Sequence, residues 1–361
     1  YHKALAIKPE FAKPHMKLEG ALKDLGKLEE ALSSYHKVLS IKPDYVEANN
    51  NLGNLLKKPK QLDEALIYYH KALVIKHDLA DAHNNLAIVL NSSGRRSEVL
   101  DYFKKRLAIE RGDNPINPQH KSFRFITKAK INHDIEQFRY LADQELETDR
   151  FLTFAKMYEA VEREIDWPRD DTMAIPLSDN HRKRLSTTYN RPIHLLEAPE
   201  VTGSTLSNAL NVDKITDDYF SHTAGMTYFD ELLNPNSLAS LRRFLLGSTI
   251  WFHFNHRLGY LGAMLKDGLA CPLLLQTAND LCQPFPDIFK NHQLTQLWAY
   301  KYDSRLKGIE VHADFAAVNV NFWITPDTAN LDPGPLSAQL IIRRNCGVSS
   351  TVLSAARSRR S

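Results

Sequence analysis

The stretch YHKVLSIKP, residues 35–43, decides the fold, because it returns along the chain at a fixed interval. YHKALAIKP occupies residues 1–9 and YHKALVIK occupies residues 69–76, so successive copies begin 34 residues apart. The aromatic residue that opens the motif recurs once more as Phe103, at the same step. A fixed period of this length predicts an array of similar helical units.

The residues between these copies keep the same step. Leucines recur at 34-residue intervals, and small residues stand where two helices must touch. The residues concerned are Leu18, Leu52, Leu86, Leu22, Leu56, Leu90, Gly53, Ala87, Ala31 and Ala65. Gly26 and Gly94 are typical of turns between helices, and Pro9 and Pro43 are typical of helix ends.

This pattern resembles the tetratricopeptide repeat, with full units near 12–45, 46–79 and 80–113 that follow the end of an earlier unit. The resemblance implies an all-α solenoid over residues 1–113, whose groove holds a protein or peptide partner. Asn51 and Asn85 each precede a repeated leucine. In the related repeats of O-linked N-acetylglucosamine transferases, asparagines at this place grip a peptide backbone. The alternative is that both are solvated polar positions.

Composition bounds the class of protein. The 361 residues are 43% hydrophobic and 25% charged, which is typical of a globular protein with two or three domains. A net charge of +3 favours neither nucleic acid nor a membrane surface, and no apolar run is long enough for a membrane span. Three scattered cysteines predict no disulfide framework and a cytoplasmic location. The first residues lack a start methionine, so we expect a fragment.

Residues 114–165 are predicted to form capping helices near 121–146 and 149–164, the second beginning at Thr148-Asp149. His133, Asp134 and Glu136 lie in the first of these helices. Because residues one or two apart on a helix do not face each other, we expect a solvated helix face there, not a metal site.

Prolines and the basic run at 181–184 predict an irregular linker over residues 166–214. Similarly, we expect packing or exposure at His15 and His83, where the repeat usually carries an aromatic residue, and no metal binding.

The pattern of residues changes near residue 215, where the third region of the chain begins. Helices are predicted near 236–247, where Asn234-Pro235 is a start signal, and near 270–283. Aromatic and β-branched residues then predict strands at 294–302 and 318–324. The chain is therefore expected to be an α + β multidomain protein, with a helical solenoid, a helical connector and a sheet braced by helices.

His312 and Asp314 lie between the two predicted strands, two residues apart, so both would point to one face of an extended chain. They supply two of the three ligands of the two-His, one-carboxylate iron(II) triad. The segment from 296 to 314 resembles 2-oxoglutarate- and iron(II)-dependent oxygenases of the prolyl hydroxylase type, loosely over 215–333. The resemblance implies an incomplete double-stranded β-helix, iron(II) on His312 and Asp314, and 2-oxoglutarate bonded to Tyr302. The alternative is a structural histidine and aspartate at a strand end.

The sequence departs from that family in one important respect. The third iron ligand of the family is a downstream histidine, and no histidine follows His312. Residues 334–361 contain no acidic residue, lysine or aromatic, which is typical of disorder or of translation in a shifted frame, and we favour the shifted frame. His253, His256 and His292 are alternative third ligands, although a core or surface role is expected for each.

Two hypotheses result. The first is a substrate-recruiting oxygenase that is inactive in this form, and the second is a non-catalytic adaptor whose repeats are its whole function. Neither hypothesis identifies the partner.

Overall fold

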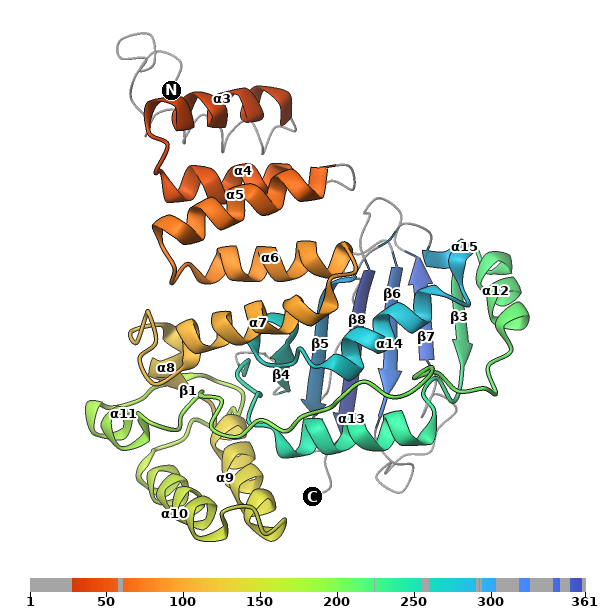
Figure 1. Ribbon diagram of the computed structural model, residues 1–361. Helices are drawn as coiled ribbons and strands as arrows, with labels where there is room; N and C mark the ends of the chain where they lie inside the picture. Colours follow the sequence, from red (N-terminus) through yellow and green to blue (C-terminus); the bar gives the residue numbers. More distant parts are fainter. Residues whose placement is uncertain are drawn as a thin grey trace. The chain divides into compact units, whose positions relative to one another are not determined.

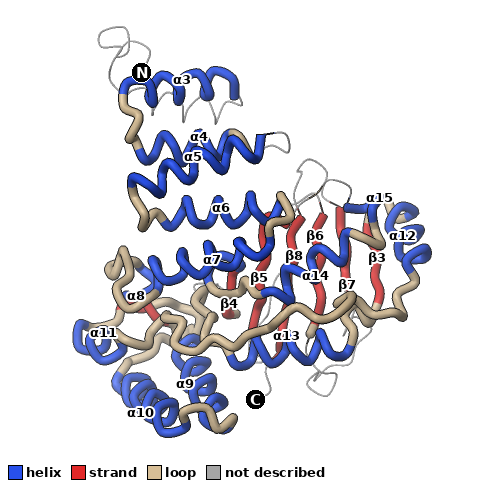
Figure 2. Tube along the Cα trace, in the orientation of Figure 1, coloured by secondary structure: helices blue, strands red, loops and turns tan. Residues whose placement is uncertain are grey.

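The computed structural model describes residues 28–57, 61–223, 225–254, 260–289, 292, 294–302, 318–324, 340–344 and 351–358. The chain divides into two compact units, Tyr1–Glu110 and Arg111–Ser361. The described residues are mainly helical, and the strands among them lie in the second unit (Figures 1 and 2). No helix in the described ranges is both long and apolar enough to cross a membrane.

The first unit is a stack of antiparallel helices (Figure 1). Its described helices are α3 (Leu28–Ile41), α4 (Val46–Leu55), α5 (Leu62–Ile75), α6 (Ala80–Ser92) and α7 (Arg96–Arg111). The helices α4 and α5 form one repeat, and α6 and α7 form the next. The 34-residue period therefore appears in space as a helix pair, as the sequence predicts.

The repeated residues form the core of this stack. The rings of Tyr35, Tyr69 and Phe103 are all at most 4% exposed, and Leu52 and Leu86 are fully buried. Small residues are required where helices approach each other. A Cβ atom added at Gly53 would lie 2.7 Å from the ring of Tyr69, so only glycine fits there in this arrangement. Gly94 has a φ of +75°, which suits the turn between α6 and α7.

The second unit begins with a helical hairpin. After α8 (Lys121–Arg124) and the short strand β1 (Phe125–Ile126), α9 (Lys128–Asp143) packs against α10 (Thr148–Glu164). Aromatic rings join the hairpin, with the centroids of Phe138 and Tyr158 5.0 Å apart. Two helices were predicted here, but α9 starts later than 121, because Thr127 caps it by accepting a hydrogen bond from the amide of Lys130.

Residues 166–214, predicted to be an irregular linker, are partly ordered and packed. This range includes β2 (Ile175–Pro176), which pairs with β1, and α11 (Asp179–Leu185), capped by Ser178. Arg184 Nη1 lies 2.6 Å and 2.8 Å from the carboxylate oxygens of Glu164 on α10, so the basic run at 181–184 is anchored by an acid. Hydrogen bonds from Arg184 and then His181 lower the pKa of Glu164.

A six-stranded sheet dominates the rest of the second unit. The strands are β3 (Met226–Phe229), β4 (Leu261–Met264), β5 (Leu294–Tyr302), β6 (Val318–Trp323), β7 (Leu340–Arg344) and β8 (Thr351–Ser358). Their order is β3-β7-β6-β8-β5-β4, and β8 runs parallel to both of its neighbours. The strands predicted at 294–302 and 318–324 are present as β5 and β6. The second, facing sheet of a double-stranded β-helix is not among the described strands.

Helices cross one face of this sheet (Figure 1). They are α13 (Pro235–Gly247) and α14 (Pro272–Cys282), and α12 (Val212–Ser221) and α15 (Pro286–Phe289) lie near one edge. A short 3-10 turn, η2 (Leu265–Asp267), follows β4. Asn234 caps α13 as predicted, accepting from the amide of Ser237 at 2.9 Å. Part of the tail at 334–361, predicted to be disordered or aberrant, forms the strands β7 and β8, which lie on either side of β6. Their Leu-Ile-Ile and Thr-Val-Leu segments have strand-forming side chains.

Candidate functional site

The two asparagines predicted to bind peptide lie on α4 and α6. The amide of Asn85 donates to Asn50 Oδ1 at 3.2 Å, and Lys57 Nζ donates to Asn85 Oδ1 at 3.4 Å. Asn85 is 8% exposed, whereas Asn51 is partly exposed. The side chain of Asn85 therefore links consecutive repeats, and a peptide would have to compete for it. Asn51 is more accessible to a partner.

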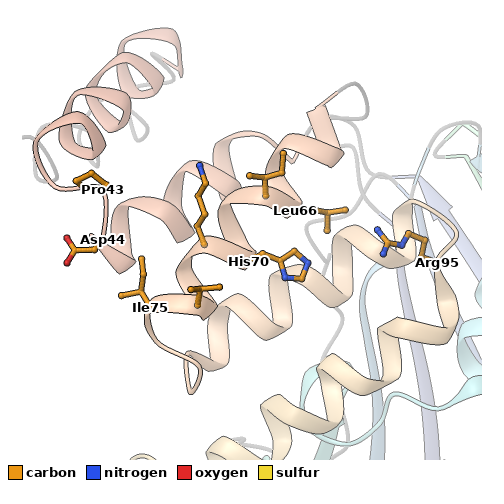
Figure 3. Close-up of a pocket in the computed structure, with 9 residues that line it drawn as sticks. Pro43, Asp44, Leu66, His70, Ile75 and Arg95 are labelled. Carbon is orange, nitrogen blue, oxygen red and sulfur yellow. The ribbon is translucent and has the colours of Figure 1, made fainter.

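Among the described residues of the repeat unit, the most exposed apolar side chains lie on a different surface. Along α5, Val74 is 87% exposed and Ile67 is 53% exposed. The two residues are seven positions apart and so lie on one face of the helix. They belong to a cavity of about 640 Å³, which also involves Leu66, His70 and Ile75 of the same helix (Figure 3). We call this surface the α5 face.

The repeat itself does not require these two apolar side chains. One period earlier, on α3, the equivalent residues are Ser33 and Ser40, and both are exposed. One period later, on α7, they are Asp101 and Ala108. By contrast, Ile75, which is 40% exposed, has an isoleucine at both equivalent positions and so belongs to the repeat pattern. Ile67 and Val74 are therefore a departure confined to one repeat, and a comparison of the copies residue by residue reveals it in the sequence.

The rim of the α5 face is mostly basic. Lys71, Arg95 and Asp44 line it, and Arg95 holds Glu98 through two bonds of 2.7 Å and 2.9 Å. Lys71 Nζ lies 4.9 Å from the ring centroid of Tyr68. These contacts fix the side chains of Arg95 and Lys71 at the edge of the apolar surface formed by Ile67 and Val74.

His70 contributes an uncharged ring to the same face. It meets Tyr102 edge-on, with centroids 6.2 Å apart and an interplanar angle of 66°. Burial, and then the positive charge of Arg95, lower the pKa of His70 below its usual value. The ring is therefore neutral at pH 7, so the positive charge of the rim comes from lysine and arginine.

His83 is buried, as one of the two alternatives for it predicted. Its Nε2 lies 2.8 Å from the carbonyl oxygen of His77, and its ring packs against Tyr102 with centroids 5.8 Å apart. His15 lies outside the described residues.

The helix face at 133–136 was predicted to be solvated, and for two of its residues this prediction is wrong. His133 is 3% exposed and Asp134 is 7% exposed. Asp134 lies 2.5 Å and 2.6 Å from Lys130 Nζ, and its Oδ1 is 3.0 Å from His133 Nδ1. Lys301 of β5 completes the group, with Nζ 3.0 Å from His133 Nε2. Lys301 is 168 residues from His133 along the chain, so a local sequence pattern cannot reveal this contact.

The residues predicted to form an iron site are only partly described. Tyr302 is the last residue of β5, whereas His312, Asp314 and His256 lie outside the described residues. His253 has another role, since its Nε2 is 2.7 Å from Asp267 Oδ2. Within the part of the chain that the structure describes, no cluster of three histidine, cysteine, aspartate or glutamate side chains could hold a metal ion. The iron site stays a prediction.

Comparisons with known proteins agree with the repeat geometry. Residues 21–59 match a family model described as TPR repeat, and residues 46–76 match one described as Tetratricopeptide repeat. Both matches fall in the first unit, and neither supports an oxygenase domain. No curated protein matches the chain at a significant level.

Solved structures of one protein, MamA, resemble part of the chain. One crystal structure of MamA is 23% identical, with a TM-score of 0.28, over 29% of this chain and 58% of that one. Another is 19% identical, with a TM-score of 0.29, over 46% of this chain and 88% of that one. The chain thus spans less than two thirds of the length of the first of these structures.

Proposed function

We propose that this tetratricopeptide-repeat chain is a protein-binding module, and that the α5 face receives an amphipathic helical segment of a partner protein. The observation that carries the proposal is the exposure of Ile67 and Val74 at positions where the neighbouring repeats carry serine, aspartate or alanine. A repeat unit suggests protein–protein interaction, and this departure from the repeat marks where the partner would bind.

The spacing of these residues favours a helical partner. Ile67 and Val74 are seven positions apart, which is about 10 Å along a helix. Two packed helices present side chains to each other at the same heptad spacing. The cavity of about 640 Å³ beside α5 is large enough for one or two apolar side chains of such a helix.

Charge selects among possible helices. The lining has two cationic side chains, Lys71 and Arg95, and one acidic side chain, Asp44, and Arg95 is paired with Glu98, so Lys71 is the cation left to meet a partner. We therefore expect apolar residues flanked by glutamate or aspartate on the partner. The apolar contacts carry most of the affinity, because burying each aliphatic side chain is worth about 1.5–3 kcal/mol, whereas exposed ion pairs are worth about 1 kcal/mol or less.

The test uses labelled synthetic peptides and the full chain, with binding followed by fluorescence anisotropy. One helical peptide carries leucines at i, i+3 and i+7 with flanking glutamates, and a second carries lysines in place of the glutamates. The test variant is Ile67→Ser with Val74→Ser, which installs the residues that α3 already carries at Ser33 and Ser40. This choice keeps the repeat fold, which far-UV circular dichroism checks.

We expect the wild type to bind the acidic peptide at least tenfold more tightly than it binds the lysine peptide. The double-serine variant should bind the acidic peptide at least tenfold more weakly than the wild type does. Leu152→Ser, an exposed apolar position on α10, is the matched control and should leave binding unchanged. Asn51→Ala tests the other surface of the repeats. Equal binding to the wild type and the double-serine variant would refute the α5 face as the binding surface, and a loss confined to Asn51→Ala would favour the surface that carries Asn51.

A further inference from the structure

The second unit holds a cavity of about 520 Å³ that the protein-binding role does not use. Its walls come from four parts of the chain: the start of the unit at Arg111, residues 120–125, Ala174, and residues 252–254. This volume is in the range of sites for small molecules. We call it the Arg111 cavity.

Aromatic rings form the apolar part of this cavity. Phe125, Phe252 and Phe254 all line it, and Phe125 is 37% exposed although it is a large apolar residue. Phe125 belongs to β1 and pairs with Pro176 of β2, so its backbone is fixed. Three phenyl rings around one space suit a flat or aliphatic body of a ligand.

A buried arginine is fixed at one wall. The side chain of Arg111 is 7% exposed, and its guanidinium lies 4.3 Å from the ring centroid of Phe252. It is also 3.8 Å from Asp267 Oδ2 and donates to the carbonyl oxygen of Asn190 at 3.4 Å. These contacts orient the cation before any ligand binds, which lowers the entropic cost of binding.

His253 is held in the same wall. Its backbone exchanges hydrogen bonds of 3.1 Å and 2.7 Å with Gly262 of β4, and its Nε2 lies 2.7 Å from Asp267 Oδ2. Asp267 is thus the shared partner of Arg111 and His253 and balances one positive charge. It stands behind the wall, since it is not a lining residue.

The remaining polar groups leave the cavity positive. Lys121 adds a second cation, and no acidic side chain occurs among the described lining residues. His120 Nδ1 accepts the amide of Ser122 at 3.2 Å, so the neutral ring carries its proton on Nε2 and can donate it. With Asp267 set against Arg111, the surplus is about one positive charge, which matches a monoanion.

We propose that the Arg111 cavity binds a small organic carboxylate with an aromatic or aliphatic body. The body lies among the rings of Phe125, Phe252 and Phe254. The carboxylate is held by Lys121 and by the N–H donors of the cavity wall. A neutral ligand of the same shape would leave the surplus charge unbalanced, and a dianion would exceed it.

The test is isothermal titration of the full chain with 3-phenylpropionate, 3-phenylpropanamide and inorganic phosphate. The acid and the amide have the same body and differ in charge. We expect the acid to bind at least tenfold more tightly than the amide, and phosphate to bind more weakly than the acid. The variants Lys121→Gln and Phe125→Ala change exposed side chains, so the fold should persist, and each should weaken binding of the acid at least fivefold.

Lys156→Gln, on the exposed face of α10, is the matched control for loss of a lysine and should bind as the wild type does. Arg111→Gln should weaken binding further, and the fluorescence of buried Trp251 reports whether that variant is folded. The proposal is overturned if the acid fails to bind at millimolar concentration. It also fails if the amide binds equally well or if Lys121→Gln and Phe125→Ala have no effect. Because these residues are not on the α5 face, peptide binding should be unchanged in all of these variants.

Discussion

The ammonium nitrogen of Lys130 lies 2.5 Å and 2.6 Å from the two carboxylate oxygens of Asp134, one helical turn away, and both side chains are buried. Burial lowers the pKa of Lys130, and the charge of Asp134 and its hydrogen bond oppose this shift. His133 and Lys301 extend the same group toward β5. Such a pair is costly to bury and much more costly to break.

Asp134→Asn should therefore destabilise the second unit strongly, by about 3–5 kcal/mol, because it leaves a buried ammonium without its counter-charge. Urea unfolding followed by tryptophan fluorescence measures this change, since all four tryptophans lie beyond residue 110.

The chain contains a matched control for that substitution. Lys214 and Asp218 have the same i,i+4 spacing at 2.5 Å, but their side chains are 68% and 44% exposed. Asp218→Asn should cost about 0.5 kcal/mol or less, because exposed pairs contribute little. If both variants lose a similar free energy of unfolding, burial of the Lys130–Asp134 pair does not affect stability.

The buried histidine of α6 should make the repeat unit sensitive to acid. Burial lowers the pKa of His83, although its hydrogen bond to the His77 carbonyl opposes the shift. Above the usual pKa near 6.5, both folded and unfolded chains carry a neutral ring, so stability is unaffected. As pH falls below that value, the unfolded chain takes up the proton first, and stability falls by at most about 1.4 kcal/mol per pH unit.

His83→Tyr, which places an aromatic at this position of the repeat, should remove that part of the pH dependence. Hydrogen exchange of α6 amides between pH 7 and pH 5 follows the local stability. His36→Tyr is a suitable control, because His36 is exposed. An unchanged slope in His83→Tyr, after correction for intrinsic exchange, would rule out His83 as the titrating group.

Gly53→Ala should destabilise the repeat unit by about 1–3 kcal/mol, a typical cost of overpacking. The added carbon would meet Cε1 of Tyr69 at 2.7 Å, and this tyrosine is held by its hydroxyl, which donates to Asn54 at 2.9 Å. Circular dichroism at 222 nm during thermal unfolding gives the change. Asn51→Ala on the same helix should have an effect below about 0.5 kcal/mol, as is usual for surface positions. A stabilised Gly53→Ala variant would mean that α4 and α5 can separate without cost.

The oxygenase hypothesis makes a prediction about activity. Because no histidine follows His312 to serve as third ligand, we expect no iron(II)-dependent decarboxylation of 2-oxoglutarate above the level of His312→Ala. Decarboxylation of 2-oxoglutarate that depends on both His312 and Asp314 would contradict this expectation and support the hypothesis that the chain is an active enzyme. Independently, the coding DNA past codon 333 should contain, in another frame, a histidine followed by arginine.

The fold of the repeat unit was largely predictable from sequence, because the same 34-residue pattern occurs several times in it. The step from Tyr35 to Tyr69 to Phe103 fixes the register, and all three rings are buried as this register requires. In the second unit, β5 and β6 were predictable from their aromatic and β-branched residues. The start of α10 agrees with the start predicted at Thr148-Asp149, but the residue in the N-cap position is Glu147, with a φ of +41°.

The polar interior of the second unit could not be predicted. His133 and Asp134 are neighbours on a helix, a spacing that ordinarily separates side chains, yet both are buried and bonded. Lys301, which lies 3.0 Å from His133, comes from β5, and its position relative to α9 is set by the tertiary fold. The α5 face is an intermediate case, because the exposed Ile67 and Val74 are visible in the sequence only when the repeats are compared with one another.

One contact of the repeat unit recurs without change. His36 meets Tyr68 at 6.2 Å and 66°, and His70 meets Tyr102 at the same distance and angle. Consecutive repeats are thus joined by the same ring contact. Duplication of a 34-residue segment could lengthen such an array while keeping this contact between repeats. One copy could then change at exposed positions while the other copies preserve the fold.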